Sequence, residues 1–211
     1  MSEGSKLYEA VLNGDSKGAL AATQEALAAG ANPIDLVSSH MAPAMDEAGR
    51  RFECEEYFVP ELLLAARAMK AAFEPIKPLL SASGAEPAGR VVIGTVKGDL
   101  HDIGKNLVAA MLEGGGYEVV DLGVDVAPEK FVQSVRDKKP DLVCLSTLLT
   151  VTMPAMKVTI KALQDAGLRD GIRIVVGGAP VTEQWAQEIG ADGFGLNAAA
   201  AVPLARKLVA R

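Results

Sequence analysis

The first 80 residues carry apolar side chains at helical spacing. Asp15 and Asn32 are each placed to cap a helix, because their side chains can accept a hydrogen bond from a first-turn backbone N–H. The helix that follows Asn32 is expected to be kinked or interrupted at Pro43, since proline lacks the N–H that the interior of a helix needs. A further helix is expected from about residue 57 to residue 80. Four helices joined by short turns predict a small antiparallel bundle over residues 1–80.

The pattern changes in the rest of the chain. Short β-branched runs alternate with helical stretches, as expected of right-handed βαβ crossovers and a parallel sheet covered on both faces. The expected strands are 90–96, 117–123, 141–147, 172–178 and the weaker 191–195.

Five such units predict an α/β domain over residues 90–211 with a flavodoxin-like (Rossmann-like) doubly wound, five-stranded parallel sheet. The stretch SASGAEPAG at 81–89 is small, polar and contains proline, so we expect it to link this domain to the helical bundle.

The loop after the first strand holds the most informative chemistry. It contains His101, one of only two histidines, between the carboxylates Asp99 and Asp102 and the glycines Gly98 and Gly104. A histidine held by a carboxylate can bind a metal through its other ring nitrogen, but the same residues also suit a capped helix start with a solvated histidine. One histidine cannot build a protein zinc site. A metal here would take most of its ligands from something other than the protein.

Two other strand ends are rich in hydroxyls or glycine. The third strand runs into Ser146 and a series of threonines, and the fourth ends in Gly177-Gly178, which would let a ligand approach the backbone. The chain has neither a G-x-G-x-x-G turn after the first strand nor a P-loop motif, so dinucleotide and nucleoside triphosphate sites lack their phosphate cradle.

These elements together resemble a known family. Asp99-x-His101-x-x-Gly104, Ser146-x-Leu148 and Gly177-Gly178, in this order, are similar to the corrinoid-binding signature of cobalamin-dependent methyltransferases. The stretch TVKGDLHDIGKN resembles that of methionine synthase and of the small corrinoid proteins of methanol, methylamine and O-demethylase systems. AGRRFECEEYFVPELLLAARAM is similar to the helical cap of the same group. The resemblance covers nearly the whole chain.

The resemblance implies roles for individual residues. His101 is expected to be the lower axial ligand of cobalt in a base-off, His-on cobalamin, with Asp99 on its other ring nitrogen and Thr152, where methionine synthases have serine, completing a relay. On the cap, Phe52 and Val59 are expected over the upper face, although both also suit the core of the helical bundle. The further expected cofactor contacts are Gly98, Asp102, Ile103, Gly104, Ser146, Leu148, Thr150, Gly177, Gly178, Ala179, Gly193 and Phe194.

The same resemblance implies a function. The chain has no room for a substrate barrel, so we expect a methyl carrier rather than a self-sufficient enzyme. Its expected partners are a substrate-specific methyltransferase, an acceptor methyltransferase that uses tetrahydrofolate or a thiol coenzyme, and a reductive activase. The linker is the expected hinge for movement of the cap. Two alternatives stay open, a mutase-type cobalamin subunit and a cobalamin-dependent sensor or regulator.

Charge narrows the list of partners. Residues 1–88 carry 13 acidic and 7 basic side chains, whereas residues 89–211 carry 14 of each, so the net charge of −6 lies in the first part. This balance argues against nucleic acid, and the short apolar runs argue against a membrane partner. We expect a cytoplasmic protein in which both Cys54 and Cys144 are packed thiols. The acidic residues Glu53, Glu55, Glu56 and Glu61 either form a solvated surface or steer docking to basic partners.

Overall fold

A computed structural model of the chain describes residues 3–76, 78–79 and 87–209. The chain divides into two compact units, one of residues 1–88 with 110–116 and one of residues 89–109 with 117–211. Residues 81–86 of the expected linker lie outside the described residues, so the predicted hinge stays a prediction.

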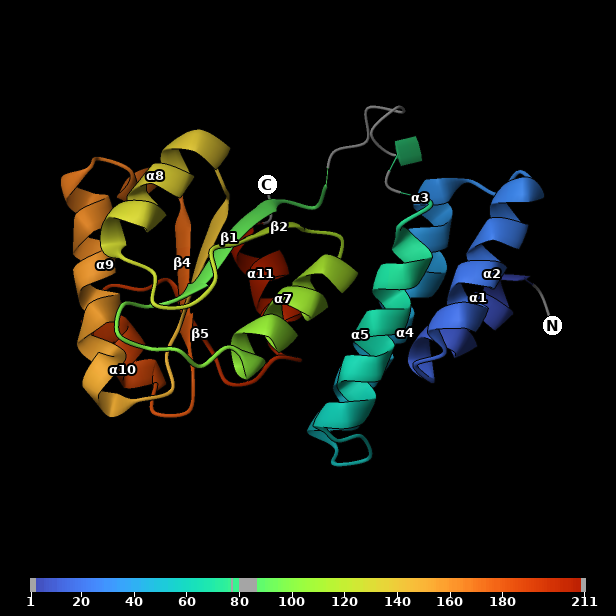
Figure 1. The fold of residues 1–211 in the computed structure, drawn as a ribbon, viewed down its shortest axis with the longest axis horizontal. Helices are drawn as coiled ribbons and strands as arrows, with labels where there is room; N and C mark the ends of the chain where they lie inside the picture. The colour runs from blue at the N-terminus through green and yellow to red at the C-terminus, as the bar shows by residue number, and fades with distance from the viewer. Residues whose placement is uncertain (1–2, 77, 80–86, 210–211) are drawn as a thin grey trace. The chain divides into compact units, whose positions relative to one another are not determined.

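The first unit is helical, and Figure 1 shows its helices packed side by side. Its elements are α1 (Glu3–Leu12), α2 (Ser16–Ala28), α3 (Pro33–Leu36), the π-helix η1 (Val37–Met41), α4 (Ala42–Glu53) and α5 (Val59–Phe73). Because α3, η1 and α4 follow one another directly, residues 3–73 form four helical segments, as the sequence predicts. Its fully buried side chains include Leu7, Met41, Met45, Leu62 and Met69.

Capping and proline chemistry explain where these helices begin and end. Asp15 accepts a hydrogen bond from Gly18 N at 2.9 Å, and Asn32 accepts one from Ile34 N at 2.9 Å. Pro43 lies in the first turn of α4, directly after the π-helix, which confirms the predicted interruption. The expected helix over 57–80 is too long, because α5 ends at Phe73. Pro75, two residues later, lacks the N–H that would continue it.

The second unit is a five-stranded parallel sheet in the order β2-β1-β3-β4-β5, which confirms the predicted flavodoxin-like topology. Its strands are β1 (Arg90–Thr95), β2 (Glu118–Asp121), β3 (Leu142–Ser146), β4 (Arg173–Gly177) and β5 (Gly193–Gly195). Its helices are α7 (Ile103–Gly114), α8 (Pro128–Lys138), η2 (Thr150–Thr152), α9 (Met153–Asp165), η3 (Arg169–Gly171), α10 (Glu183–Glu188) and α11 (Ala201–Val209).

Helices cover both faces of this sheet. Figure 1 shows α7 and α11 on one face and α8, α9 and α10 on the other. A buried cluster on the second face joins the strands to these three helices and includes Val92, Phe131, Leu145, Ile160 and Val176. Because both faces are covered, only the ends of the strands are open to a ligand, and the carboxyl ends are where doubly wound sheets bind one.

Candidate functional site

The strand register aligns the predicted motifs at one edge of the sheet. Thr95 of β1 pairs with Ser146 of β3, Ser146 with Gly177 of β4, and Gly177 with Gly195 of β5. The loops that follow these four residues therefore leave the sheet from the same edge. The chain order reverses between β1 and β3, so the loops after these two strands flank the switch point of the fold.

The loop after β1 holds His101 through the carboxylate of Asp99. Asp99 Oδ1 lies 2.7 Å from His101 Nδ1 and also accepts the backbone N–H of His101 at 3.0 Å. The Asp99 side chain is fully buried, whereas the side chain of His101 is 50% exposed. A carboxylate on Nδ1 favours the tautomer with the proton on that nitrogen, which leaves Nε2 as a lone-pair donor. His101 is therefore exposed to solvent, as in the alternative interpretation, but Asp99 fixes its ring.

The other carboxylate oxygen joins this loop to the one after β3. Asp99 Oδ2 accepts hydrogen bonds from Leu148 N at 2.7 Å, Thr147 Oγ1 at 2.9 Å and Thr152 Oγ1 at 3.0 Å. Burial alone would raise the pKa of Asp99. The hydrogen bonds from the backbone of His101 and Leu148, and from the side chains of His101 and Thr147, instead hold this pKa well below its ordinary value. Asp99 is therefore a buried, ionised anchor for the imidazole.

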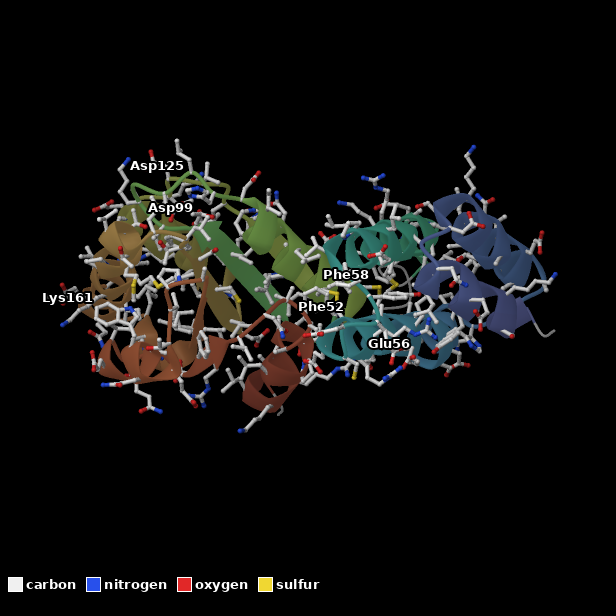
Figure 2. All side chains as sticks on the ribbon, turned by 90° about the horizontal axis from the view of Figure 1, so that it is seen from below. Phe52, Glu56, Phe58, Asp99, Asp125 and Lys161 are labelled. Carbon is white, nitrogen blue, oxygen red and sulfur yellow. The ribbon has the colours of Figure 1, made fainter. Side chains whose placement is uncertain are left out.

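Two further residues fix the backbone of this loop. Thr95 Oγ1 donates to the carbonyl of His101 at 2.8 Å. Asp125, with φ 52° in the left-handed region that Asp tolerates, accepts Gly98 N at 2.8 Å and pairs with Lys97 at 3.0 Å. Figure 2 shows Asp125 beside Asp99, and Asp125 N donates to the carbonyl of Asp99 at 2.9 Å. No sequence motif indicates these roles of Thr95 and Asp125, or that of Thr147.

Large apolar side chains in the loops at this edge of the sheet are exposed. Leu100 and Ile103 in the loop after β1 are 72% and 71% exposed, Val151 after β3 is 81% exposed, and Leu196 after β5 is 76% exposed. Leu148 is also exposed, while its backbone N–H is engaged by Asp99. Exposed apolar side chains at the edge of the sheet that carries His101 suit a large ligand with apolar surface.

The glycines of the motif differ in how closely other atoms approach them. Gly178, with φ 131°, lies so close to the loop after β3 that a Cβ would be 1.7 Å from the carbonyl oxygen of Thr147. Gly177 is also close to backbone, since a Cβ there would lie 3.2 Å from the carbonyl oxygen of Gly195. Gly104 faces open space, because a Cβ there would meet no atom within 4 Å. Close approach to another backbone segment explains Gly177 and Gly178, whereas no crowding requires a glycine at position 104.

The remaining predicted contacts are spread over this unit. Asp102 is exposed and accepts the Asn106 side chain at 3.1 Å, while Thr150 and Ala179 are exposed at the same edge of the sheet. Ser146 ends β3, and its carbonyl accepts Val96 N at 3.0 Å. Gly193 and Phe194 lie in β5, where the ring of Phe194 packs against the core on the α8–α10 face.

On the helical unit, Val59 is 39% exposed, so it is not the core residue of the alternative interpretation. Phe52 is half-buried, and the neighbouring Phe58, which no sequence motif marks, is 65% exposed. Figure 2 shows both aromatic side chains.

The expectation of two packed thiols is wrong for Cys54, which is exposed at the end of α4, and correct for Cys144, which is buried in β3.

Comparison with known proteins identifies the family. The B12 binding domain family matches residues 89–203, and a second B12 binding domain family matches residues 5–77. A trimethylamine corrinoid protein from Methanosarcina acetivorans is 41% identical over 206 residues, which cover 97% of this chain and 95% of the relative. The chain belongs to the B12-binding corrinoid proteins. The predicted family and the predicted cofactor, a corrinoid, are confirmed.

Solved structures of corrinoid proteins agree with this assignment. A cobalamin-binding protein from Desulfitobacterium hafniense matches with a TM-score of 0.82 and 33% identity, covering 99% of this chain and 98% of the other. The methanol:cobalamin methyltransferase complex MtaBC from Methanosarcina barkeri matches with a TM-score of 0.85 and 32% identity, covering 99% of this chain and 80% of that chain.

The residues of this corrinoid protein fit the group. Over the part of the chain that the structure describes, no three His, Cys, Asp or Glu side chains are grouped to hold a metal ion by themselves. A corrin ring brings nitrogen ligands of its own, so a site that offers a single imidazole fits such a group although it could not hold a bare metal ion. Within the same described residues, no helix is long and apolar enough to cross a bilayer.

Proposed function

We propose that this corrinoid protein carries a methyl group between two methyltransferases, with His101 as the lower ligand of a base-off, His-on cobalamin. The observation that carries the proposal is the 2.7 Å contact between the half-exposed His101 ring and the buried Asp99 carboxylate, at the switch point of the sheet. When bound, the corrinoid would supply a cobalt ion able to accept and release a methyl group, and His101 would hold that ion.

The residues of the chain have three tasks in this proposal. Asp99 orients the imidazole and keeps its proton on Nδ1, so that Nε2 would be available as a metal ligand. The exposed apolar side chains of the same loops, such as Leu100, Ile103 and Val151, would contact the corrinoid and exclude water from His101. The expected contacts from Ser146 and Thr150 to Gly177, Gly178 and Ala179 line the slot for the displaced nucleotide tail.

The helical unit has a separate task. We propose that its exposed apolar residues Phe52, Phe58 and Val59 cover the upper face of the ring between reactions and withdraw when a methyltransferase docks. A site at the carboxyl ends of the strands needs such a cover because a reactive ligand bound there would otherwise be exposed to water. The segment 81–89 is the proposed hinge.

The relatives favour a methylamine as the source of the methyl group. The trimethylamine corrinoid protein is 41% identical, and a dimethylamine corrinoid protein from Methanosarcina acetivorans is 40% identical over 180 residues. The methanol system matches at 32% identity. In this scheme the chain itself does not contact the methyl donor, so the partner methyltransferase determines the substrate specificity. The proposed acceptor methyltransferase and reductive activase complete the cycle.

Reconstitution tests this proposal. The protein is loaded with hydroxocobalamin, reduced, and mixed with trimethylamine or methanol and the matching methyltransferase, while the absorption spectrum reports formation of methylcobalamin. We expect methylation in the trimethylamine system and its loss in His101→Ala at unchanged helical content. A protein that binds cobalamin but is methylated in neither system would contradict the carrier function and favour a sensor.

The four glutamates between the end of α4 and the first turn of α5 give a second test of partner docking. Glu56 pairs with Arg50 at 3.4 Å and Glu61 accepts Phe58 N at 3.0 Å, whereas Glu53 and Glu55 are exposed carboxylates close to Phe52 in sequence. We propose that the latter two steer the approach of a basic partner surface.

The variant Glu53→Gln/Glu55→Gln is expected to slow association with the methyltransferase about threefold to tenfold at low salt, and the difference should vanish at about 1 M salt. Glu183→Gln/Glu188→Gln on α10 carries the same change in charge on the other unit and is the matched control. Equal association rates for both variants and the wild type at low salt would contradict the steering role.

A further inference from the structure

Two threonines, rather than one, reach the carboxylate that holds His101. Thr152 is the hydroxyl that the family resemblance predicts, but Thr147 Oγ1 lies just as close to Asp99 Oδ2, at 2.9 Å against 3.0 Å. Both side chains are buried, with 1% and 8% exposure. They come from opposite ends of the same connection, Thr147 directly after β3 and Thr152 at the end of η2.

The contact between the two hydroxyls limits what each can donate. Thr147 Oγ1 and Thr152 Oγ1 are 2.5 Å apart, so one hydroxyl proton must lie between them. Each threonine has one hydroxyl proton, so a single proton remains for Asp99. Two arrangements satisfy the geometry equally, in which either Thr147 or Thr152 donates to the carboxylate and accepts from the other. The carbonyl of Leu149, 2.9 Å from Thr152 Oγ1, is an alternative acceptor.

We propose that Thr147 is a second positioning residue for the axial histidine, interchangeable with Thr152 as the hydroxyl donor to Asp99. This proposal rests on the proposed role of His101. A hydroxyl donor on Oδ2, together with the N–H of Leu148 at 2.7 Å, holds the carboxylate in the rotation that presents Oδ1 to His101 Nδ1. Either threonine supplies that donor when the other is missing, because removal of one frees the proton of the other from the contact between them.

The proposal predicts a strongly non-additive mutant cycle. Thr147→Val and Thr152→Val keep the shape of the side chain and remove the hydroxyl. Each single variant should weaken ligation of cobalt by His101 less than about threefold, whereas the double variant should weaken it about tenfold or more, since a hydrogen bond to a charged group is worth a factor of about 10–150. The double variant Thr147→Ser/Thr152→Ser, which keeps both hydroxyls, should ligate as the wild type does.

Two measurements are made on each variant of this mutant cycle. In the apo-protein, nitrogen NMR of the imidazole reports whether His101 carries its proton on Nδ1, without any cofactor. In the protein loaded with methylcobalamin, the visible spectrum reports whether the cobalt has a nitrogen ligand below. Thr159→Val is the matched control, because Thr159 is also fully buried but donates to Ala155 O within its own helix at 2.8 Å.

We expect the Nδ1 tautomer in the wild type, in both single variants, in the serine double variant and in the control, and a mixture of tautomers only in the valine double variant. Loss of the Nδ1 tautomer in Thr152→Val as complete as in the double variant would overturn the proposal, because Thr147 would then contribute nothing. A valine double variant that behaves as the wild type would overturn it as well. If methylcobalamin bound without a nitrogen ligand in the wild type, the role of His101 would fail while the tautomer cycle still decided whether the two threonines position it.

Discussion

The substitution Asp99→Asn tests how much of the stability of the site depends on one buried carboxylate. An amide has nearly the same shape but replaces one acceptor oxygen with an NH₂ donor. If the NH₂ group faces the loop after β3 it meets the N–H of Leu148, and if it faces the other way it meets the N–H of His101. In either rotation, one partly buried backbone donor loses its acceptor.

The cost follows from these contacts. A buried unsatisfied donor costs about 1–3 kcal/mol, and the hydrogen bonds that remain become neutral ones, worth about 0.5–1.5 kcal/mol rather than about 1.5–3 kcal/mol. We therefore expect Asp99→Asn to lower the free energy of unfolding of the α/β unit by about 2–5 kcal/mol. Urea unfolding of the apo-protein measures it, because the single tryptophan, Trp185, packs against the core of this unit and reports its unfolding by fluorescence.

The effect should depend on pH in a defined direction. The pKa of Asp99 is depressed in the folded protein, so its stabilisation is fully present above the unfolded value of about 4 and is lost as the pH falls below it. The difference between wild type and Asp99→Asn should therefore be constant from about pH 8 to about pH 5 and shrink below about pH 4. Asp102→Asn, which changes an exposed carboxylate in the same loop, is the control. A loss of unfolding free energy in Asp99→Asn within about 0.5 kcal/mol of that control would refute the role of Asp99 as a buried anchor.

Two further predictions concern space and solvent access. Gly104→Leu should leave the free energy of unfolding unchanged or slightly raised, because no atom lies within 4 Å of its Cβ position, but it should weaken methylcobalamin binding about tenfold in a titration. The control Gly171→Leu, at an equally uncrowded position in η3, should bind methylcobalamin normally. Equal binding by the two variants would contradict a ligand beside Gly104. Iodoacetamide at about pH 8 should modify only Cys54 in the native protein and both thiols in urea, because burial raises the pKa of the Cys144 thiol to about 12. Rapid labelling of Cys144 in the native protein would instead show that β3 opens.

Local chemistry in the sequence predicted much of the site. Asp99 and His101 are two residues apart in one loop, so spacing made a carboxylate–imidazole pair one of two open interpretations, and the family resemblance decided between them. The sheet topology followed from the alternation of β-branched runs and helical stretches. Thr152 was found only through resemblance to a family, since 53 residues separate it from Asp99 and no periodicity connects them.

The residues that the sequence did not predict depend on register or on backbone conformation. Thr147 reaches Asp99 because β1 and β3 pair with Thr95 opposite Ser146, a register that composition does not reveal. Asp125 supports the loop from beyond the end of β2 through a left-handed backbone conformation, for which a non-glycine residue gives little warning. The exposure of Cys54 depends on where α4 ends, and helix ends are the least predictable feature of a sequence.

The axial ligation of cobalt by His101 is the central claim, and electron paramagnetic resonance tests it most directly. The protein is prepared with ¹⁵N-labelled histidine, loaded with unlabelled cobalamin and brought to the cobalt(II) state. A nitrogen ligand from the protein then splits each line into a doublet, whereas the benzimidazole of the unlabelled cofactor gives a triplet. We predict the doublet in the wild type and its disappearance in His101→Ala. A triplet in the labelled wild-type protein would show that the cofactor keeps its own base and would contradict axial ligation by His101.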